Sequence, residues 1–391
     1  MLAHQPNRGA LHAALHWTTA PGRARIVFAL AGALVLLNLM AFAFGEAPLD
    51  NLRRAFMGTW GTPYGIGQVL FKSTPLILTG LAFHVSLRAG LFNIGTEGQL
   101  ALASLFGTWV ATKLPASWPW PLALPIVLAA AIAVGAAYAG IAGAMRARLG
   151  VHEIISGIML NRSADVVLPW VLVAGLGATG LRTADIVRGA KLSRLDRWIG
   201  AFSGSAASVA FPIAVVVAIG VYVWLERSRV GREMRWVGLG SDACAAQGIA
   251  VARRQIQAML LSGALAGGAM AGTVLGYKGY YELGLGAGAG FTGIAVAMLG
   301  RVGPVALVAS ALVFGTVAQA GLAINAQVPK EAMGVLEAAV IIFVALAART
   351  HKAVAVPPPE SAPADPPGSS AAKPPSDSPM ADTEASVRPS C

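Results

Sequence analysis

The stretch Pro121-Leu-Ala-Leu-Pro-Ile-Val-Leu-Ala-Ala-Ala-Ile-Ala-Val-Gly-Ala-Ala-Tyr-Ala-Gly-Ile-Ala-Gly-Ala-Met145 decides the fold class, because it holds no Asp, Glu, Lys or Arg. About 20 apolar residues, each rising ~1.5 Å, cross the ~30 Å hydrocarbon core of a bilayer as a helix. A backbone in lipid must satisfy its own hydrogen bonds, which leaves helices or closed barrels. The apolar residues here are continuous and do not alternate with polar ones, so the stretch predicts a transmembrane helix.

Four more stretches lack charged residues, namely 26–45, 208–225, 255–276 and 302–329. The composition of the whole chain agrees with them. The chain is 56% hydrophobic and 12% charged, with a mean hydropathy of +0.65, whereas soluble domains carry about 25% charged residues. The remaining apolar surface needs lipid to cover it. We therefore predict an all-α fold, a polytopic transmembrane helical bundle embedded in the lipid bilayer.

Helix-length apolar segments recur about ten times along the chain. The expected spans are 26–45, 66–87, 97–113, 121–145, 154–175, 208–225, 255–276, 287–300, 303–323 and 333–348. With ten crossings, the flanking Arg and Lys clusters fall on one side, which the positive-inside rule assigns to the cytoplasm, so both termini are expected there. The loop 176–207 is basic although it is expected outside. Long loops cross despite their charge, and this one is a candidate docking face.

Three regions differ in composition. Residues 1–25 are polar and basic and are expected as a cytoplasmic N-terminal segment, followed by a transmembrane domain over 26–348. Residues 353–391 hold ten of the 23 prolines and show no hydrophobic period. Such a segment buries too little apolar surface to offset its ordering entropy, so we expect a disordered Pro/Ala/Ser-rich cytoplasmic tail. Glycine-rich stretches at 90–98 and 284–293 are compatible with inverted repeats.

The segment Arg88-Ala-Gly-Leu-Phe-Asn-Ile-Gly-Thr-Glu-Gly-Gln99 places three glycines and several polar side chains at the start of an expected span. Unwound backbone at membrane depth is tolerated only where protein or a water-filled cavity satisfies it. The segment is therefore a candidate for a solute pathway. A plainer interpretation is that Asn93 and Glu97 cap the helix that begins near Thr96, and the two interpretations are compatible.

The segment Val151-His-Glu-Ile-Ile-Ser-Gly-Ile-Met-Leu-Asn161 is followed by Arg162 and Asp165. Charged residues inside a span usually face a cavity or a partner. Arg162 and Asp165 are three residues apart and share a helix face, so they can neutralise one another. A structural ion pair is favoured here over a contact with solute. His152 and Glu153 do not form a metal pattern, because no further ligand follows at helical spacing.

The segment Gly231-Arg-Glu-Met-Arg-Trp-Val-Gly-Leu-Gly-Ser-Asp-Ala-Cys-Ala-Ala-Gln-Gly-Ile249 lies in an expected cytoplasmic loop. Its pattern predicts a short helix with a face of small residues, closed by Gly248 as a C-terminal stop. An ordinary basic loop attracted to anionic lipid is the alternative.

Motifs of catalysis are missing from the sequence. There is no Gly-x-x-x-x-Gly-Lys-[Ser/Thr] phosphate loop, so the chain is not expected to hydrolyse ATP. A nucleophile elbow, a zinc spacing and a dinucleotide fingerprint are missing too. We therefore expect no enzymatic activity, no cofactor and no metal site. The net charge of +11 comes from cations beside hydrophobic spans, so nucleic acid is not an expected partner.

At these segments the chain resembles a known family. Phe92–Gln99 resembles the "FNIGxEGQ" signature of ABC-importer permeases of the simple sugar and nucleoside class, the ribose-type family linked to external lipoproteins. Glu153–Asn161 is similar to that family's "NEVIS-x-x-MLN". Arg235–Ile249, Met259–Gly267 and Gly290–Gly300 resemble its coupling loop and the spans that follow, in the family's order.

The resemblance extends over about residues 66–348 and implies a permease subunit in a bacterial inner (plasma) membrane. Its implied partners are separate ATP-binding ABC subunits, a second homologous permease subunit and an extracytoplasmic substrate-binding lipoprotein. The candidates for the substrate pathway are Phe92, Asn93, Gly95, Glu97, Gln99, Glu153 and Asn161. The candidates for the coupling loop to the ATPase are Arg235, Gly238, Ala243, Gly248 and Ile249.

The long "MLN" motif favours nucleosides over ribose as the solute. Two positions depart from the family. Arg162 stands where an aromatic residue is usual, which bears on the substrate, and Gly240-Ser241 replaces an Asn-Pro pair in the coupling loop. The alternative function is an ion- or proton-coupled secondary transporter of small polar solutes. The sequence disfavours it, because it lacks a relay of paired carboxylates in the membrane.

Overall fold

The computed structural model describes residues 48–176, 179–301 and 303–325, together with positions 32, 35, 42, 338, 339 and 342. All of these belong to one compact unit, 1–351, and a second unit, 352–391, lies outside the described residues. The regular secondary structure of the described part is helical throughout. This confirms the predicted all-α fold class.

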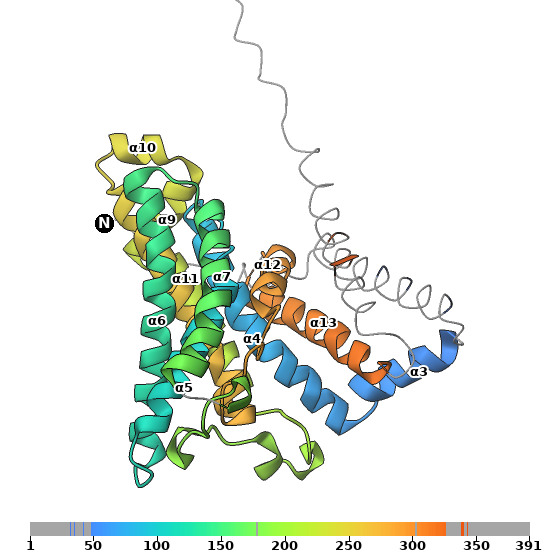
Figure 1. Cartoon of the computed structure of the whole chain (residues 1–391). Coiled ribbons are helices and arrows are strands. Elements are labelled where there is room, and N and C mark those ends of the chain that lie inside the picture. Colours follow the sequence, from blue (N-terminus) through green and yellow to red (C-terminus); the bar gives the residue numbers. More distant parts are fainter. Residues whose placement is uncertain are drawn as a thin grey trace, which may run out of the picture. The chain divides into compact units, whose positions relative to one another are not determined.

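The chain forms eleven α-helices in its described part (Figure 1). They are α3 Pro48–Thr59, α4 Pro63–Arg88, α5 Thr96–Lys113, α6 Trp120–Leu149, α7 Glu153–Trp170, α8 Ala210–Arg227, α9 Arg229–Leu239, α10 Ser241–Ala246, α11 Val251–Gly268, α12 Ala289–Leu299 and α13 Pro304–Ala323. The wider turns of two π-helical segments extend α7 and α11, as η2 Val171–Gly175 and η7 Ala271–Lys278.

Eight of the ten expected spans coincide with these helices. The first and last, 26–45 and 333–348, lie almost wholly outside the described residues, as do the N-terminal segment 1–25 and the tail 353–391. By length and composition, six helical segments are long and apolar enough to cross a membrane: Pro63–Arg88, Trp120–Leu149, Glu153–Gly175, Ala210–Arg227, Val251–Lys278 and Pro304–Ala323. The apolar helix α12 is shorter. The chain is thus a multi-pass helical membrane protein.

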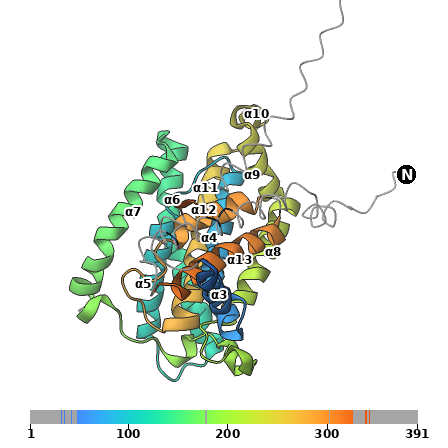
Figure 2. The same cartoon turned by 90° about the vertical axis from the view of Figure 1, so that its right-hand side faces the viewer.

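Two helices form the centre of the bundle. The apolar windows of α4 and of α11 with η7 are 72% and 78% buried, against 22–28% for α6, α7 and α8. The less buried helices keep apolar faces free for lipid or for other subunits, and Figure 2 shows α7 at the edge of the bundle with α4 and α11 in its middle. Small residues bring α6 and α11 together: a methyl group on Gly263 would collide with the backbone of Gly135, as is usual between membrane helices.

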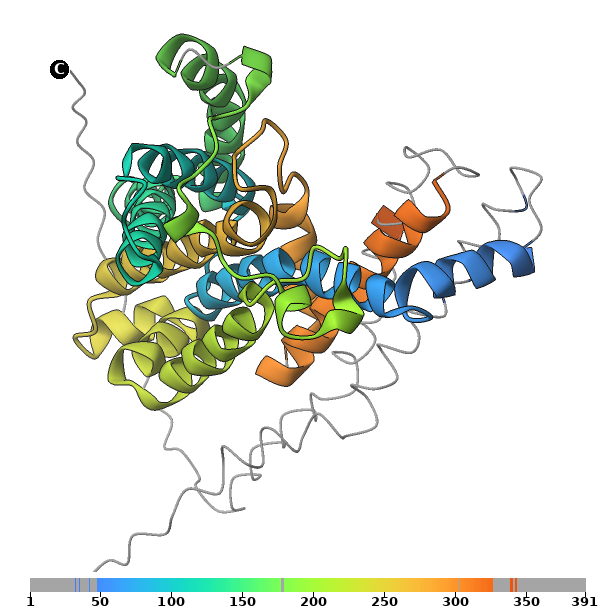
Figure 3. The same cartoon turned by 90° about the horizontal axis from the view of Figure 1, so that it is seen from below.

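The two ends of the bundle carry different structures. Helices α9 and α10 lie at one end, which we call the α9–α10 end, and the segment 176–207 lies at the other, the loop end (Figures 1 and 3). The segment contains four short 3₁₀ turns, η3 Thr179–Leu181, η4 Arg188–Ala190, η5 Leu195–Arg197 and η6 Gly200–Phe202. Helix α4 connects both ends, because Gly67 packs against Ser205 near its start and Arg88 contacts Gly238 at its finish.

Candidate functional site

The segment between α4 and α5 is held by short hydrogen bonds at the end of α4. The chain turns at Gly90, whose φ of +74° favours glycine, and Leu91 N–H donates to the Ser86 carbonyl at 3.0 Å. The Phe92 ring then packs edge-on against Phe83, with ring centroids 4.6 Å apart. The residues that follow, up to the start of α5 at Thr96, contain the polar candidates.

Asn93 and Gln99 form a reciprocal pair of amides. Each donates its NH₂ group to the other's side-chain oxygen at 3.0 Å, and both residues are at most 1% exposed. Asn93 also donates to the Ser262 hydroxyl at 2.8 Å, and Ser262 donates to the Ala82 carbonyl at 2.7 Å. The network therefore joins α4, α5 and α11 through hydrogen-bonded groups, as buried polar groups require.

Asn161 of α7 holds the same turn from the other side. Its side-chain oxygen accepts from the backbone N–H of Gly98 at 2.9 Å, and its NH₂ group donates to the Ile94 carbonyl at 3.0 Å. The Gly98 amide lies in the first turn of α5, where helices have unpaired donors. Gly95 allows this approach, since its backbone lies close to Gly157 of α7. Asn161 thus fixes the start of α5 against α7.

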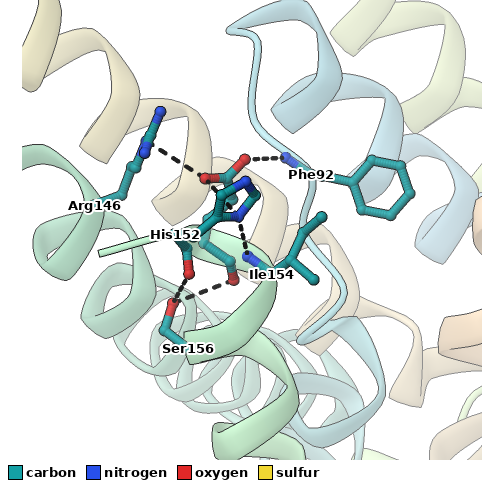
Figure 4. Close-up of polar contacts among 6 residues, drawn as sticks. Phe92, Arg146, His152, Ile154 and Ser156 are labelled. Carbon is teal, nitrogen blue, oxygen red and sulfur yellow. Dashed lines mark hydrogen bonds and ion pairs between the residues drawn. The ribbon is translucent and has the colours of Figure 1, made fainter. Parts of the chain in front are cut away.

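Glu153, the first residue of α7, bonds to Phe92 at the beginning of the same segment; Figure 4 shows Phe92, Arg146 and His152 around it. The residue is 6% exposed, and one carboxylate oxygen accepts from the Phe92 N–H at 3.3 Å. The other oxygen lies 3.4 Å from Arg146 Nε and 3.7 Å from His152 Nδ1. The carboxylate therefore sits at the junction of α6, α7 and the segment after α4.

The Glu97 carboxylate forms its hydrogen bonds in a different part of the bundle, at the start of α12. Its two carboxylate oxygens accept from the backbone N–H groups of Gly288 and Gly290, at 2.6 and 2.8 Å. These donors open α12, where a carboxylate satisfies unpaired amides and matches the positive end of the helix dipole. The expectation that Asn93 and Glu97 cap the helix beginning near Thr96 is wrong, because the N-cap residue of α5 is Gly95, which makes no side-chain cap, and Asn161 of α7 bonds to the first turn instead. Glu97 stabilises the start of a different helix.

Six of the seven pathway candidates thus meet in one buried cluster, which we call the α5 bracket: Phe92, Asn93, Gly95, Gln99, Glu153 and Asn161. Their described contacts are with one another and with neighbouring helices. A pathway role stays a prediction for all seven. The sequence did not single out Ser262, whose hydroxyl completes the network.

The segment 229–249 forms two helices, where the sequence predicted one. The Ser228 hydroxyl caps α9 by accepting from Gly231 N–H at 2.9 Å, α9 ends at Gly240, and α10 follows at once. Gly248 closes α10, as predicted, with a φ of +78°. Gly248 and Ile249 donate to the carbonyls of Ala245 and Cys244 at 3.0 Å, the paired hydrogen bonds of a Schellman ending.

The segment presents an exposed surface. Every residue of α10 except Cys244 is exposed, Ala243 included, and so are Trp236 and Leu239 at the end of α9. Arg235 is half exposed and pairs with Glu226 at 3.3 Å. Exposed apolar side chains in one place are typical of a surface that another protein or the membrane covers.

The inner side of α9 is fastened to the bundle. Buried Glu233 pairs with Arg229 at 2.7 Å and with Arg254 of α11 at 2.6 Å. Hydrogen bonds from Arg229 and then Arg254 hold the pKa of the Glu233 carboxyl below its ordinary value. A Cβ on Gly238 would lie 2.8 Å from the Gly90 nitrogen and would strike the Arg88 carbonyl oxygen. Helix α9 therefore rests directly on the turn that begins the α5 bracket.

A family model described as "Branched-chain amino acid transport system / permease component" matches residues 65–345, well over half of the chain. The chain belongs to this permease family. Apart from the first two residues of α4, its described spanning helices, the α5 bracket and the segment 229–249 lie inside the matched region. No solved structure matches the permease.

Curated relatives agree with the family. The permease is 31% identical over 327 residues to the glucose ABC transporter permease protein TsgB13 of Haloferax volcanii, covering 81% of this chain and 85% of the relative. It is 33% identical to the nucleoside ABC transporter permease protein NupB of Lactococcus lactis, covering 82% and 89%. It is also 33% identical to the guanosine ABC transporter permease protein NupP of Bacillus subtilis, covering 81% and 89%. At 27% identity it matches a second nucleoside permease, NupC, from L. lactis and a second guanosine permease, NupQ, from B. subtilis.

The loop end of the permease carries a basic cavity. The sequence predicted a basic loop here, as a candidate docking face, but not the cavity. The cavity has a volume of about 480 Å³ and four cationic side chains in its wall: Arg188, Lys191, Arg194 and Arg197. The guanidinium of Arg194 lies over the Tyr277 ring at 5.7 Å, and its Nε is buried without a hydrogen-bond partner. A surface of this charge attracts anionic groups.

Proposed function

We propose that this permease is the membrane-spanning subunit of an ABC importer that carries nucleosides or simple sugars and is driven by separate ATP-binding subunits. The observation that carries the proposal is the similarity to three ABC permeases. They are 31–33% identical in sequence to this chain over more than four fifths of its length. Two of the three are named for nucleosides, so nucleosides are the favoured solutes. Under this proposal the chain forms the transport pathway, and another subunit hydrolyses ATP.

The ATP-binding subunits would dock on α9 and α10. These helices expose Trp236, Leu239 and Ala243 at the α9–α10 end, while Glu233 and Gly238 fix α9 to α11 and to the end of α4. Helix α9 has one face exposed to a partner and the opposite face fixed to α11 and to the end of α4. It can therefore transmit a movement of the partner to the bundle. We assign the coupling role to Arg235, Gly238, Ala243, Gly248 and Ile249 on this basis. The α9–α10 end, and with it both termini, would be cytoplasmic.

A second permease subunit would complete the core. L. lactis and B. subtilis each hold two related permeases that resemble this chain, at 33% and 27% identity, which favours a core of two different subunits. The α5 bracket and Glu97 would position α5, α7 and α12 along the solute pathway at that core. The seven candidate residues of the pathway act there mainly by fixing these helices.

An extracytoplasmic binding lipoprotein would deliver the solute at the loop end. Its acidic side chains would meet the basic cavity of Arg188, Lys191, Arg194 and Arg197. Opposite charges across such an interface speed the encounter and set the orientation of the partners. The importer would then work in a bacterial plasma membrane, with solute entering at one end and ATP binding at the other.

Reconstitution tests the proposal. The permease, its second permease, the ATP-binding subunits and the binding protein are placed in proteoliposomes, and uptake of labelled nucleosides is followed. We expect uptake that needs both ATP and the binding protein. Uptake that a proton gradient drives without ATP would overturn the proposal and favour a secondary transporter.

A further inference from the structure

A second cavity, separate from the α5 bracket, lies at the loop end where α3, α4, η7 and α13 meet. Its volume is about 790 Å³, and the side chains in its wall that carry the argument are Tyr64, Gln68, Phe71, Lys72, Tyr277 and Gln319. Pockets for small ligands usually measure about 300–1,000 Å³. The cavity is thus large enough for a solute with two rings.

One face of α4 supplies four of the residues in the wall. Tyr64, Gln68, Phe71 and Lys72 follow the i, i+4, i+7, i+8 spacing that places side chains along one helix face. They lie in the first three turns of the helix, within about 13 Å of its start at ~1.5 Å per residue. The cavity therefore opens near the loop end of α4 and remote from Arg88 at the other end.

The aromatic rings have defined positions. The centroids of Phe71 and Tyr277 are 4.8 Å apart with their planes at 54°, and Tyr64 lies about two turns before Phe71 on the same face. Tyr277 belongs to the π-helical segment η7, and π-helical turns are frequent at functional sites. The wider turn places Tyr277 in the walls of both this cavity and the basic cavity.

Two amides provide hydrogen bonds beside the rings. Gln68 donates to the Tyr64 hydroxyl at 2.9 Å, and buried Gln319 of α13 donates to the Gly58 carbonyl at 3.3 Å. An amide offers both donors and acceptors. Three rings with two amides match a flat heteroaromatic solute, whose face stacks on the rings and whose edge forms hydrogen bonds. A bare pentose offers hydroxyls without an aromatic face and fits this wall less well.

We propose that this cavity is an outer chamber that binds the base of a nucleoside as it enters the permease. The inference rests on the proposed function and adds a binding site, with its residues, for the favoured solute. Phe71 and Tyr277 provide the stacking surface, and Gln68 and Gln319 read the edge of the base. The neighbouring basic cavity, which shares Tyr277, lies where the binding protein would release the solute.

The test uses the complete reconstituted importer with Phe71→Leu, which puts a smaller apolar side chain in place of the ring, and Gln68→Met, which keeps the side-chain length without the amide. We expect each variant to lower nucleoside uptake about fivefold or more, since stacking on an aromatic side chain contributes strongly to base binding. Phe71→Tyr keeps the ring and should keep the uptake. The matched control is Phe106→Leu, which removes a ring from α5 outside the cavity.

Photolabelling provides a direct readout of binding. The importer is irradiated with 8-azidoadenosine, and the labelled peptides are mapped. We expect label on residues 63–72 or 271–278, reduced by excess adenosine, not reduced by ribose, and weakened in Phe71→Leu. If the wild type shows no ATP-dependent uptake, the proposed function itself is wrong. If the wild type imports nucleosides while both variants keep normal uptake and labelling, the chamber is wrong and the proposed function stands.

Discussion

Ser262 shows how one small side chain can hold a membrane site together. Its hydroxyl accepts from Asn93 at 2.8 Å and donates to the Ala82 carbonyl at 2.7 Å, so it connects α11 with α4 and with the segment after it. The residue is fully buried. In such a place water cannot replace a lost partner, and an unpaired polar group is costly.

Ser262→Ala should therefore destabilise the permease. It leaves one Asn93 donor without its acceptor, and a buried unsatisfied group costs about 1–3 kcal/mol. We expect a lower melting temperature of the purified importer. Thermal unfolding is followed by tryptophan fluorescence or by the fluorescence of a thiol-reactive dye. The control is Ser163→Ala, because the Ser163 hydroxyl bonds only to the Met159 carbonyl on the exposed face of α7. An equal melting temperature for Ser262→Ala and wild type would remove Ser262 from the network.

The sequence singled out most residues that meet in the α5 bracket but did not predict their hydrogen-bond partners. Asn93, Gln99, Glu153 and Asn161 stand out because polar side chains are rare in apolar spans. Their contacts are long-range, however: Asn93 and Ser262 are 169 positions apart, and Glu97 and Gly288 are 191 apart. Helical spacing relates residues three or four positions apart and carries no information on such pairs. The Glu97 cap was assigned to the wrong helix for this reason.

At the scale of elements, the contact between α9 and the end of α4 is the structural link between the proposed coupling surface and the α5 bracket. It depends on Gly238, whose missing side chain lets the two backbones touch at Arg88 and Gly90. Glu233 adds a second attachment through Arg254 of α11. Both attachments lie on the side of α9 that faces the bundle.

Gly238→Ala should reduce coupling by pushing α9 away from this turn. The new methyl group would strike the Arg88 carbonyl oxygen, and backbone cannot yield as a flexible side chain can. We expect ATP-dependent uptake to fall about tenfold or more while ATP hydrolysis by the assembled importer continues. Gly240→Ala is the matched control, because its Cβ would meet only the Ala243 methyl, at 3.9 Å, with φ at −172°. Unchanged uptake in Gly238→Ala would exclude this contact from transmission.

Most elements could be predicted from hydrophobic length alone, since eight expected spans coincide with helices. The division of segment 229–249 at Gly240 was missed, because the helical pattern on both sides continues through it. The π-helical turns η2 and η7 were also missed. Hydrophobic length does not distinguish a π-helical turn from an α-helical one, and Tyr277 lies in one of them.

At the scale of the whole molecule, the sequence predicted a multi-pass bundle but could not show which of its faces meet lipid. Helix α7 raises this question most sharply. Arg162 and Asp165 form the expected ion pair at 3.3 Å, yet their side chains are 79% and 62% exposed. They lie about 14 and 18 Å along a segment of 23 residues that is long enough to span the membrane. A charged side chain at that depth costs about 2.5–3.5 kcal/mol against lipid.

This pair should therefore face the second permease subunit. We expect Arg162→Leu combined with Asp165→Leu to insert normally but to lose co-purification with the second permease and ATP-dependent uptake, because a polar contact at the interface is gone. Val166→Leu, an apolar change on the same exposed face of α7, should keep both. If instead the pair faced lipid, removing two charges would stabilise the chain and leave assembly intact. Blue-native electrophoresis and uptake measured on the same membranes distinguish these outcomes, and a fully assembled, active double variant would assign this face of α7 to lipid.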